Sequence, residues 1–433
     1  MIPTWLAVPL AVALATLSAS SQTERVREEF ADGSTKKEYS VDKDNELHGA
    51  YIEYYEGGAK KLRASYYKGK LDGAYESWYS SGPRRSTRAY RRGDLQSLTT
   101  YDEAGTVIHE VVRKKGRLVL PLVGRPDVVI HPRTLAEIGK ELARIDPPDA
   151  APVPITFEKE PHTEAPYAAG ELSTKCVADA MKRLNAFRYL SFVAPDIKPD
   201  SKYSELAQHA ALVCFLNKDL SHTPPQPAGL PKDIYALGYE GAQASNLHQG
   251  QSSLREAIDG FMDDSDDRNI RGVGHRRWIL TPSLTKSGMG LVGGFVALHV
   301  QDSKRRGLSR LTVSYPAAGY YPIEFLAGTH VAWHLSWDSS RIQEDPSEPI
   351  SVECYSLDES YELGDRLEVR DITQSHDAVG ELPALIFRPV LTKEQFVPGL
   401  KVLVRVKGLK LPKKESADYV VELFSLKGDP NGK

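Results

Sequence analysis

A repeat of 24 residues near the amino end of the chain limits its fold more than any other feature of the sequence. The tetrapeptide His-Gly-Ala-Tyr at residues 48–51 recurs as Asp-Gly-Ala-Tyr at 72–75, and Gly69 recurs as Gly93. Aromatic residues favour half-buried strands, and glycine allows the tight turns between them. A short repeat buries its apolar surface only against its neighbouring copies. The pattern therefore predicts a sheet of β-hairpins over residues 24–115.

The tyrosine and glycine spacing of these copies resembles MORN-like repeats. Between His48 and Leu95 there are ten basic and five acidic residues, so the local net charge is +5. Such a surface would attract an anionic cell-surface polymer or lipid headgroups, although a solvated sheet face accounts for the same residues. The whole chain has 55 basic and 58 acidic residues and contains no zinc-finger or P-loop motif, so we expect no nucleic acid partner.

The first 20 residues have the composition of a signal peptide. An apolar run extends from Trp5 to Leu17, and small residues follow at 18–20, as at a signal-peptidase site. The run is shorter than the about 20 apolar residues that span a bilayer. We therefore expect a secreted or cell-envelope (extracytoplasmic) protein whose mature chain begins near Ser21 and has no transmembrane span.

Three further segments come after the repeats. Residues 116–169 combine one helical pattern with a proline-rich linker. Residues 170–302 begin with two amphipathic helices and end in glycine-punctuated apolar runs that are typical of strands. Apolar residues alternate at period two through residues 313–427, which predicts an immunoglobulin-like β-sandwich. The sequence thus predicts an α+β multidomain protein.

The segment over residues 170–302 carries six short motifs in order. They are Leu-Asn-Ala-Phe-Arg at 184–188, Leu-Ser-His-Thr-Pro-Pro at 220–225, Ser-Asn-Leu-His-Gln-Gly at 245–250, Gly-His-Arg-Arg-Trp-Ile-Leu at 274–280, Gly-Met-Gly at 288–290 and Ala-Leu-His-Val at 297–300. This series resembles the CAP superfamily (SCP-like extracellular domains), the secreted modules of venom allergens and cysteine-rich secretory proteins. The resemblance implies a central α/β/α sandwich.

The resemblance also implies a cleft with two histidines and two acidic residues, which binds a divalent metal in some members. His222 and His275 match the two histidines. Ser245, followed by the matching Asn246, stands where the family has its first glutamate, so one carboxylate is missing.

The second acidic position lies on a helix that begins at a capping box, Ser-Leu-Arg-Glu at 253–256. Asp263 and Asp264 both compete for it. At about 100° per residue, Asp264 lies close to the apolar face of the helix and Asp263 points away. We therefore expect Asp264 in the cleft.

Two histidines and one carboxylate, namely His222, His275 and Asp264, would just meet the minimum for a catalytic zinc site. Because the other carboxylate is missing, the sequence favours a non-enzymatic binding module of bacterial type whose cleft histidines tie its walls together. The alternative is a metal-dependent hydrolase in which a divalent metal such as zinc activates a water molecule. A serine-type variant with Ser245 as nucleophile has the residue types but no recognisable elbow motif.

The three cysteines are too few for a disulfide scaffold. Cys176 opens one predicted helix and Cys214 lies late in the next, so antiparallel packing of these helices would let an exported protein join them. Cys354 lies at strand spacing from two apolar residues and is expected to be a core thiol.

Overall fold

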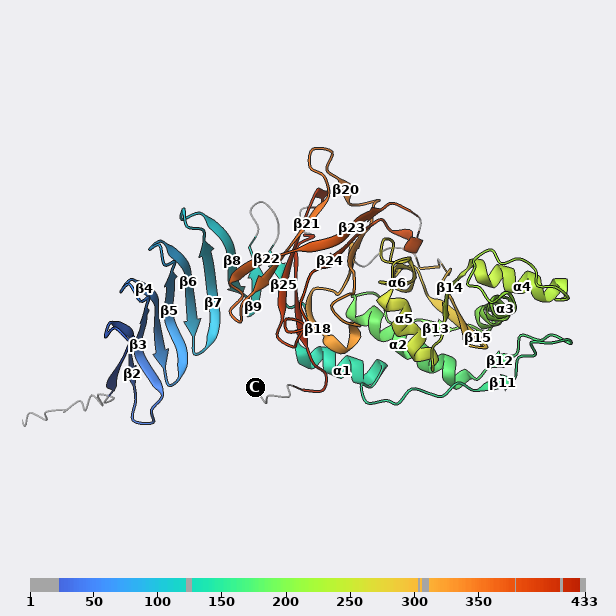
Figure 1. The fold of residues 1–433 in the computed structure, drawn as a ribbon, viewed down its shortest axis with the longest axis horizontal. Helices are drawn as coiled ribbons and strands as arrows, with labels where there is room; N and C mark the ends of the chain where they lie inside the picture. The colour runs from blue at the N-terminus through green and yellow to red at the C-terminus, as the bar shows by residue number, and fades with distance from the viewer. Residues whose placement is uncertain are drawn as a thin grey trace, which may run out of the picture. The chain divides into compact units, whose positions relative to one another are not determined.

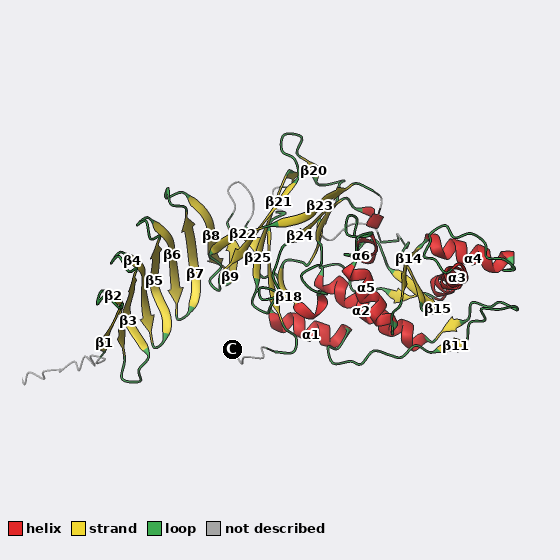
Figure 2. Cartoon of the chain, in the orientation of Figure 1, coloured by secondary structure: helices red, strands yellow, loops and turns green. Residues whose placement is uncertain are grey.

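The computed structural model describes residues 23–121, 127–302, 304–305, 311–377, 379–412 and 416–428. The chain divides into two compact units, Met1–Glu110 and Val111–Lys433. The helices that the structure describes belong to the second unit (Figure 2). The predicted signal peptide at residues 1–20 lies outside the described residues. Among the helices described, none has the length and apolar character needed to cross a membrane.

The first unit is an antiparallel sheet in which each strand pairs with its neighbours in the chain (Figure 1). Its strands are β1 (Glu24–Glu29), β2 (Thr35–Val41), β3 (Leu47–Tyr54), β4 (Lys60–Tyr67), β5 (Lys70–Trp78), β6 (Arg84–Arg91) and β7 (Asp94–Tyr101). Tyr51 lies opposite Ala64 across β3 and β4, and Tyr75 and Arg88, each 24 positions later, lie opposite one another across β5 and β6. The sequence repeat is therefore also a repeat of strand register. The MORN-like identity of these copies remains a prediction.

Tyrosines pair across the strands of this sheet. The ring of Tyr51 lies 5.8 Å from that of Tyr39 and 5.6 Å from that of Tyr66, measured between centroids. The Arg88 guanidinium lies 4.5 Å over the Tyr75 ring, and the Arg88 side chain is buried. Cross-strand aromatic and cation–π pairs of this kind stabilise a sheet beyond its backbone ladder.

Two turns at one end of the sheet, β4–β5 and β6–β7, carry basic residues. Lys68 and Gly69, like Arg92 and Gly93, have positive φ angles of 48°, 72°, 52° and 92°. Two consecutive residues with positive φ make the type I′ turn, whose twist matches that of the strands. Glycine has no steric penalty there, and the preceding position tolerates a long, solvated cation.

The second unit opens with strands and one helix. Strand β8 (Val107–Lys114) begins in the first unit and pairs with β9 (Arg117–Leu120), which pairs with β10 (Val128–Val129). Helix α1 (Leu135–Ile145) starts at a capping box between Thr134 and Glu137. The proline-rich stretch after α1 contains regular structure. Strand β11 (Phe157–Lys159) lies within it and pairs antiparallel with β12 (Glu171–Leu172), which follows it.

The central segment is a four-stranded sheet with helices on both faces. Its elements are α2 (Thr174–Leu190), β13 (Lys198–Pro199), α3 (Ser201–Asn217), α4 (Lys232–Gln243), β14 (Ser245–Gln249), α5 (Leu254–Asp263), α6 (Gly274–Ile279), β15 (Lys286–Val292) and β16 (Phe295–His299), and the strand order is β13-β15-β16-β14. Alternate residues of β16 face opposite layers. Phe295 and Ala297 pack with α3 and α4, whereas Val296 and Leu298 join the core of α2 and α5.

The Gly-Met-Gly motif lets α3 lie directly on β15. A Cβ atom at Gly288 would lie 2.1 Å from the Ser204 nitrogen, and one at Gly290 would lie 2.3 Å from the carbonyl group of Ala207. Real Cβ atoms do not approach backbone atoms so closely. The two glycines are therefore required by helix–strand contact, and the motif is explained by packing.

The expected bond between Cys176 and Cys214 is wrong, because all three cysteines are free and buried. Cys176 lies in the first turn of α2, and its Sγ is 2.8 Å from the Ser173 hydroxyl. Cys214 packs from α3 with Ala242 of α4. The two helices cover opposite faces of the sheet, so β15 and β16 separate the thiols.

The C-terminal part contains two larger sheets that share one core, together with a two-stranded pair. The first sheet has the order β17 (Thr312–Tyr315), β19 (Trp333–Trp337), β24 (Ala384–Pro389), β23 (Val369–Ser375), and the second has the order β18 (Gly319–Pro322), β27 (Tyr419–Phe424), β25 (Lys401–Lys407), β21 (Ser351–Leu357), β22 (Leu363–Leu367). The pair is β20 (Gln343–Glu344) with β26 (Leu409–Lys410), and single 3₁₀ turns lie at Ile323–Phe325 and Val379–Glu381. Cys354 is buried on β21, as expected. Strands β18 and β27 pair in parallel, whereas the sheets of an immunoglobulin-like sandwich are antiparallel. An immunoglobulin-like topology therefore stays a prediction.

The core of these sheets continues into the helical layer of α2 and α5. The Phe187 ring of α2 lies 4.9 Å from that of Phe325 and 6.3 Å from that of Tyr315, between centroids. One cluster of buried residues contains all three side chains. The second unit thus has a common hydrophobic core across its helical and all-β parts.

Candidate functional site

His275 and Asp264 form the centre of the predicted cleft. Nδ1 of His275 lies 2.9 Å from Oδ1 of Asp264, and the Asp264 side chain is fully buried while that of His275 is about one-fifth exposed. Oδ2 of Asp264 accepts a hydrogen bond from the backbone N–H of Arg276 at 3.3 Å. A buried carboxylate in this position fixes the ring orientation and keeps the proton on Nδ1.

The position of Asp264 results from a helix end and not from the helical angle. Helix α5 ends at Asp263, and Asp264 is its C-cap with φ 47° and ψ 29°, in the left-handed region. The angles of a continuing helix therefore do not describe the position of Asp264. Asp263 instead contacts His330, with Oδ2 3.1 Å from Nε2.

Asn246 supports His275 through the backbone. Its Nδ2 donates to the His275 carbonyl at 2.9 Å, which ties β14 to the start of α6. Ser245 lies on the other face of β14, because side chains alternate along a strand and Leu247 packs with α3 and α4. The Ser245 hydroxyl is buried without a hydrogen-bond partner. The structure therefore does not bring Ser245 to Asp264 and His275.

His222 makes a structural contact of its own. Its Nδ1 lies 2.9 Å from the Ala242 carbonyl in the last turn of α4. This bond joins the loop after α3 to α4. Such a contact is what a histidine that ties the cleft walls together would make.

His248 is the neighbour of His275 that the sequence did not single out. The Phe261 ring packs against both imidazoles, at 5.6 Å from His248 and 5.4 Å from His275. Burial lowers the pKa of His248, and the nearby His275 lowers it further. The signal that could have found His248 is its period-two relation to Asn246 on β14.

The donor set does not fit a tightly bound zinc ion. Nowhere in the described ranges do three or more His, Cys, Asp or Glu side chains gather as a metal ion would need. His275 and Asp264 already bond to one another, His222 bonds to a carbonyl, and Ser245 supplies no carboxylate. A structural or catalytic zinc site uses three or four protein ligands. The described cleft side chains therefore fall short of a complete zinc ligand set.

The two arginines of the Gly-His-Arg-Arg motif have structural roles. The Arg276 side chain is fully buried; its Nε donates to the Met262 carbonyl at 2.6 Å and its Nη1 to the Ala332 carbonyl at 2.5 Å. Arg277 donates to the Leu382 carbonyl at 2.6 Å. Both side chains thereby link the cleft to the C-terminal sheets, which keeps α6 and His275 in place.

His299 is a buried titratable group on β16, directly opposite Ser245 of β14. Its ring stacks on that of Tyr203, with centroids 4.0 Å apart. Burial is the main cause that lowers the pKa of His299 to about 4. Its folded pKa is thus below the unfolded value of about 6.5.

We expect His299 to make the fold acid-sensitive. As the pH falls below about 6.5, the unfolded chain takes up this proton before the folded chain does, so stability falls until about pH 4, by roughly 3 kcal/mol in all. Urea unfolding at pH 7, 5.5 and 4 should show a smaller loss for His299→Phe, which keeps the ring stack. Equal losses in both proteins would contradict this assignment.

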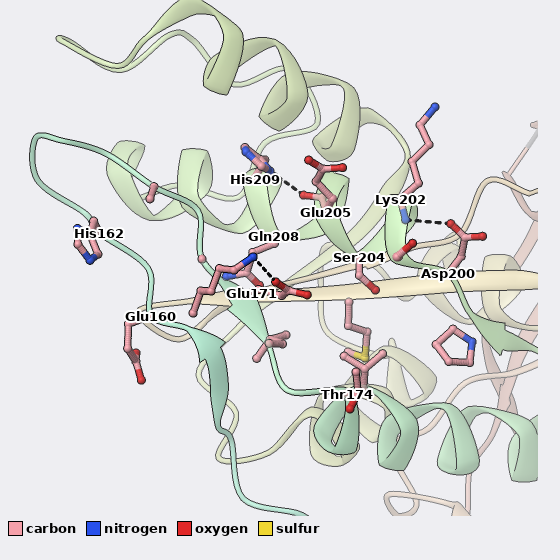
Figure 3. A pocket seen from close by; sticks show the side chains of 18 residues that line it. Glu160, His162, Glu171, Thr174, Asp200, Lys202, Ser204, Glu205, Gln208 and His209 are labelled. Carbon is pink, nitrogen blue, oxygen red and sulfur yellow. Dashed lines mark hydrogen bonds and ion pairs between the residues drawn. The ribbon is translucent and has the colours of Figure 1, made fainter.

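A cavity of about 840 Å³ lies away from these residues (Figure 3). The start of α3, the β11–β12 hairpin and the first turns of α2 line it. It includes Pro199 of β13, at the sheet edge opposite to β14. The sequence did not predict this cavity, because one of its walls comes from residues interpreted as a linker.

One comparison with known proteins, the family model, agrees with the motifs. The model of the Cysteine-rich secretory protein family (CAP) matches residues 181–295. An extracellular protein containing an SCP domain from Bacillus anthracis str. Ames is 12% identical with a TM-score of 0.23, covering 58% of this chain and 85% of that one. A cysteine-rich secretory protein from Staphylococcus aureus subsp. aureus Mu50 is 11% identical with a TM-score of 0.20, covering 64% and 79%. No curated protein matches the chain. The family match supports a CAP domain in the part of the second unit where the ordered motifs predict one.

Proposed function

We propose that the protein is a secreted or cell-envelope binding protein whose CAP domain acts without catalysis. The observation that carries this proposal is the state of His275, which is bonded to Asp264 and packed on Phe261. The other motif side chains, Arg276 and Arg277, bond to carbonyl groups that hold the fold together. Side chains that are bonded within the fold in this way are suited to holding a binding surface in shape. The signal-like leader and the family match support export.

The second candidate is a metal-dependent hydrolase, and one feature favours it. In the described part of the chain, Nε2 of His275 has no hydrogen-bond partner, while Nδ1 is oriented by Asp264. A carboxylate that orients a histidine in this way is common behind metal ligands. His222 would be the second ligand. It could bind the metal through Nε2 and keep the contact between its Nδ1 and the Ala242 carbonyl, whereas binding through Nδ1 would break that contact.

Zinc titration separates the two candidates. We expect wild type to show only weak uptake after chelation and dialysis, unchanged in His275→Ala. His376→Ala is the matched control, because His376 is an exposed histidine just after β23, in the C-terminal part. Uptake of one zinc ion per chain that disappears in His275→Ala, but persists in His376→Ala, would favour the hydrolase. Thermal melting of each variant verifies its folding.

The basic turns of the first unit suggest an anionic polymer or lipid headgroup as the partner. We expect retention on dextran sulfate that falls with salt, since exposed charges are screened over about 8 Å at physiological ionic strength. Arg88 is excluded from the test because it is buried under Tyr75. The variant replaces four basic residues in or next to these turns by serine, namely Lys68, Lys70, Arg91 and Arg92. The control replaces four lysines at the opposite ends of the strands by serine, namely Lys36, Lys37, Lys60 and Lys61.

Earlier elution of the turn variant than of the control is expected. Equal elution of the two variants would reject the turn end as the contact surface, because both lose the same charge.

A further inference from the structure

We propose that the 840 Å³ cavity binds a primary alkylammonium group carried on an apolar chain. Two sources share this chemistry, a free polyamine and the lysine side chain of a peptide. The cavity is of the size that binds small ligands. It lies apart from His275 and Asp264, so the inference does not depend on the function proposed for them.

Charge is the first reason for a cationic ligand. Four acidic side chains and two lysines line the cavity. Two of the acids are paired within the protein, because Lys159 Nζ lies 2.9 Å from Glu171 and Lys286 Nζ lies 2.7 Å from Asp200. Among the described residues, the remaining acids, Glu160 and Glu205, have no ion pair and only Lys202 to oppose them. The lining therefore keeps an excess negative charge.

The helix start at the cavity does not reverse this preference. A helix N-terminus attracts anions through its free N–H groups. At α3 the Asp200 carboxylate already accepts from two of them, the N–H groups of Lys202 and Tyr203, at 3.1 and 3.3 Å. The cap thus occupies two of the donors that an anionic ligand would use.

The floor of the cavity supplies the apolar contact. Leu172 and Val177 lie there and keep an exposed surface of 6% and 5%, whereas Met289 is fully buried. Figure 3 shows Glu205 on α3 and Glu171 on the hairpin strand, and both line the cavity. An alkyl chain can cover the floor while its ammonium group reaches the acidic rim. The Lys159–Glu171 pair is exposed, at 77% and 54%, so it is weak enough for a ligand ammonium to compete for Glu171.

Calorimetric titration of the full chain tests this site with three compounds: 1,5-diaminopentane, Nα-acetyl-lysine methylamide, whose side-chain ammonium is free, and hexanoate. We expect saturable binding of the diamine and none of hexanoate, which has a similar apolar chain and the opposite charge. Binding of the Nα-acetyl-lysine methylamide as well as the diamine assigns the site to peptide lysine side chains. Binding of the diamine alone assigns it to polyamines. The proposal is wrong if neither amine binds up to about 10 mM, or if hexanoate binds more tightly.

Four variants locate the binding. Glu205→Gln should weaken diamine binding about fivefold and Lys202→Gln should strengthen it by a similar factor, as expected for one exposed charge pair of about 1 kcal/mol. Glu240→Gln, an exposed change on α4 that removes the same charge outside the cavity, should have no effect. Equal affinity in Glu205→Gln and Glu240→Gln would show that the amine binds elsewhere. Thr174→Trp should abolish binding by filling the cavity, with melting as the check on folding.

Discussion

Gly290→Ala is expected to lower the free energy of unfolding by more than about 3 kcal/mol. Its Cβ would lie 2.3 Å from the Ala207 carbonyl group and from the Gln208 Cα. Those atoms belong to the backbone of α3, so no side-chain rotation can relieve the clash. The helix must move away from β15, and its buried alanine face would then lose contact with the sheet. Chemical denaturation monitored by tryptophan fluorescence measures the change.

Gly139→Ala is the matched control, because it makes the same substitution in the same unit. Gly139 lies inside α1, and a Cβ there would meet nothing within 4 Å. Alanine is the better helix former by about 0.5–1 kcal/mol, so this variant should be more stable than wild type. Opposite signs for the two variants are expected. A loss of stability in Gly139→Ala as large as that in Gly290→Ala would contradict the packing explanation.

Arg276→Met is expected to cost about 3–5 kcal/mol of stability and to release α6. The arginine donates to the carbonyls of Met262, Asp263 and Ala332, and its guanidinium lies 4.3 Å over the Tyr315 ring. Methionine fills much of the volume but offers no donor, so the three buried carbonyls lose a partner. The same denaturation experiment, together with the amide NMR signals of α6, reports both effects.

Arg271→Met serves as its control, five positions earlier. Arg271 is exposed, and exposed substitutions change stability by about 0.5 kcal/mol or less. If both methionine variants unfold at the same denaturant concentration, then Arg276 does not act as the joint between the cleft and the C-terminal sheets.

Local periodicity allowed the hairpin sheet and the helices to be predicted. The repeat marks strand register, and the spacing of glycines marks turns and close approaches, because both depend on residues near in sequence. The preference for Asp264 over Asp263 agreed with the contact to His275, although its reason lay in a left-handed C-cap that helical angles do not include. The point where a helix ends depends on the residues beyond it and on their tertiary contacts, which a regular pattern cannot express.

The features that sequence reasoning missed are tertiary. The pairing of Cys176 with Cys214 assumed neighbouring helices, whereas a sheet lies between them. Ser245 was grouped with His275 by motif order, but strand alternation turns it to the other layer. The cavity requires the hairpin at residues 157–172 to fold against α3, and no local signal in a proline-rich stretch specifies that contact.

The matching registers of the first unit have a consequence for how this protein could change length over evolution. Strands β3 and β4 meet as β5 and β6 do, shifted by 24 positions. Loss or duplication of one such block would bring together edges that already fit, with each ring still facing a suitable partner. Loss of a few residues within a strand would misalign that strand with both of its neighbours. Natural length variants of this unit should therefore differ by whole hairpins.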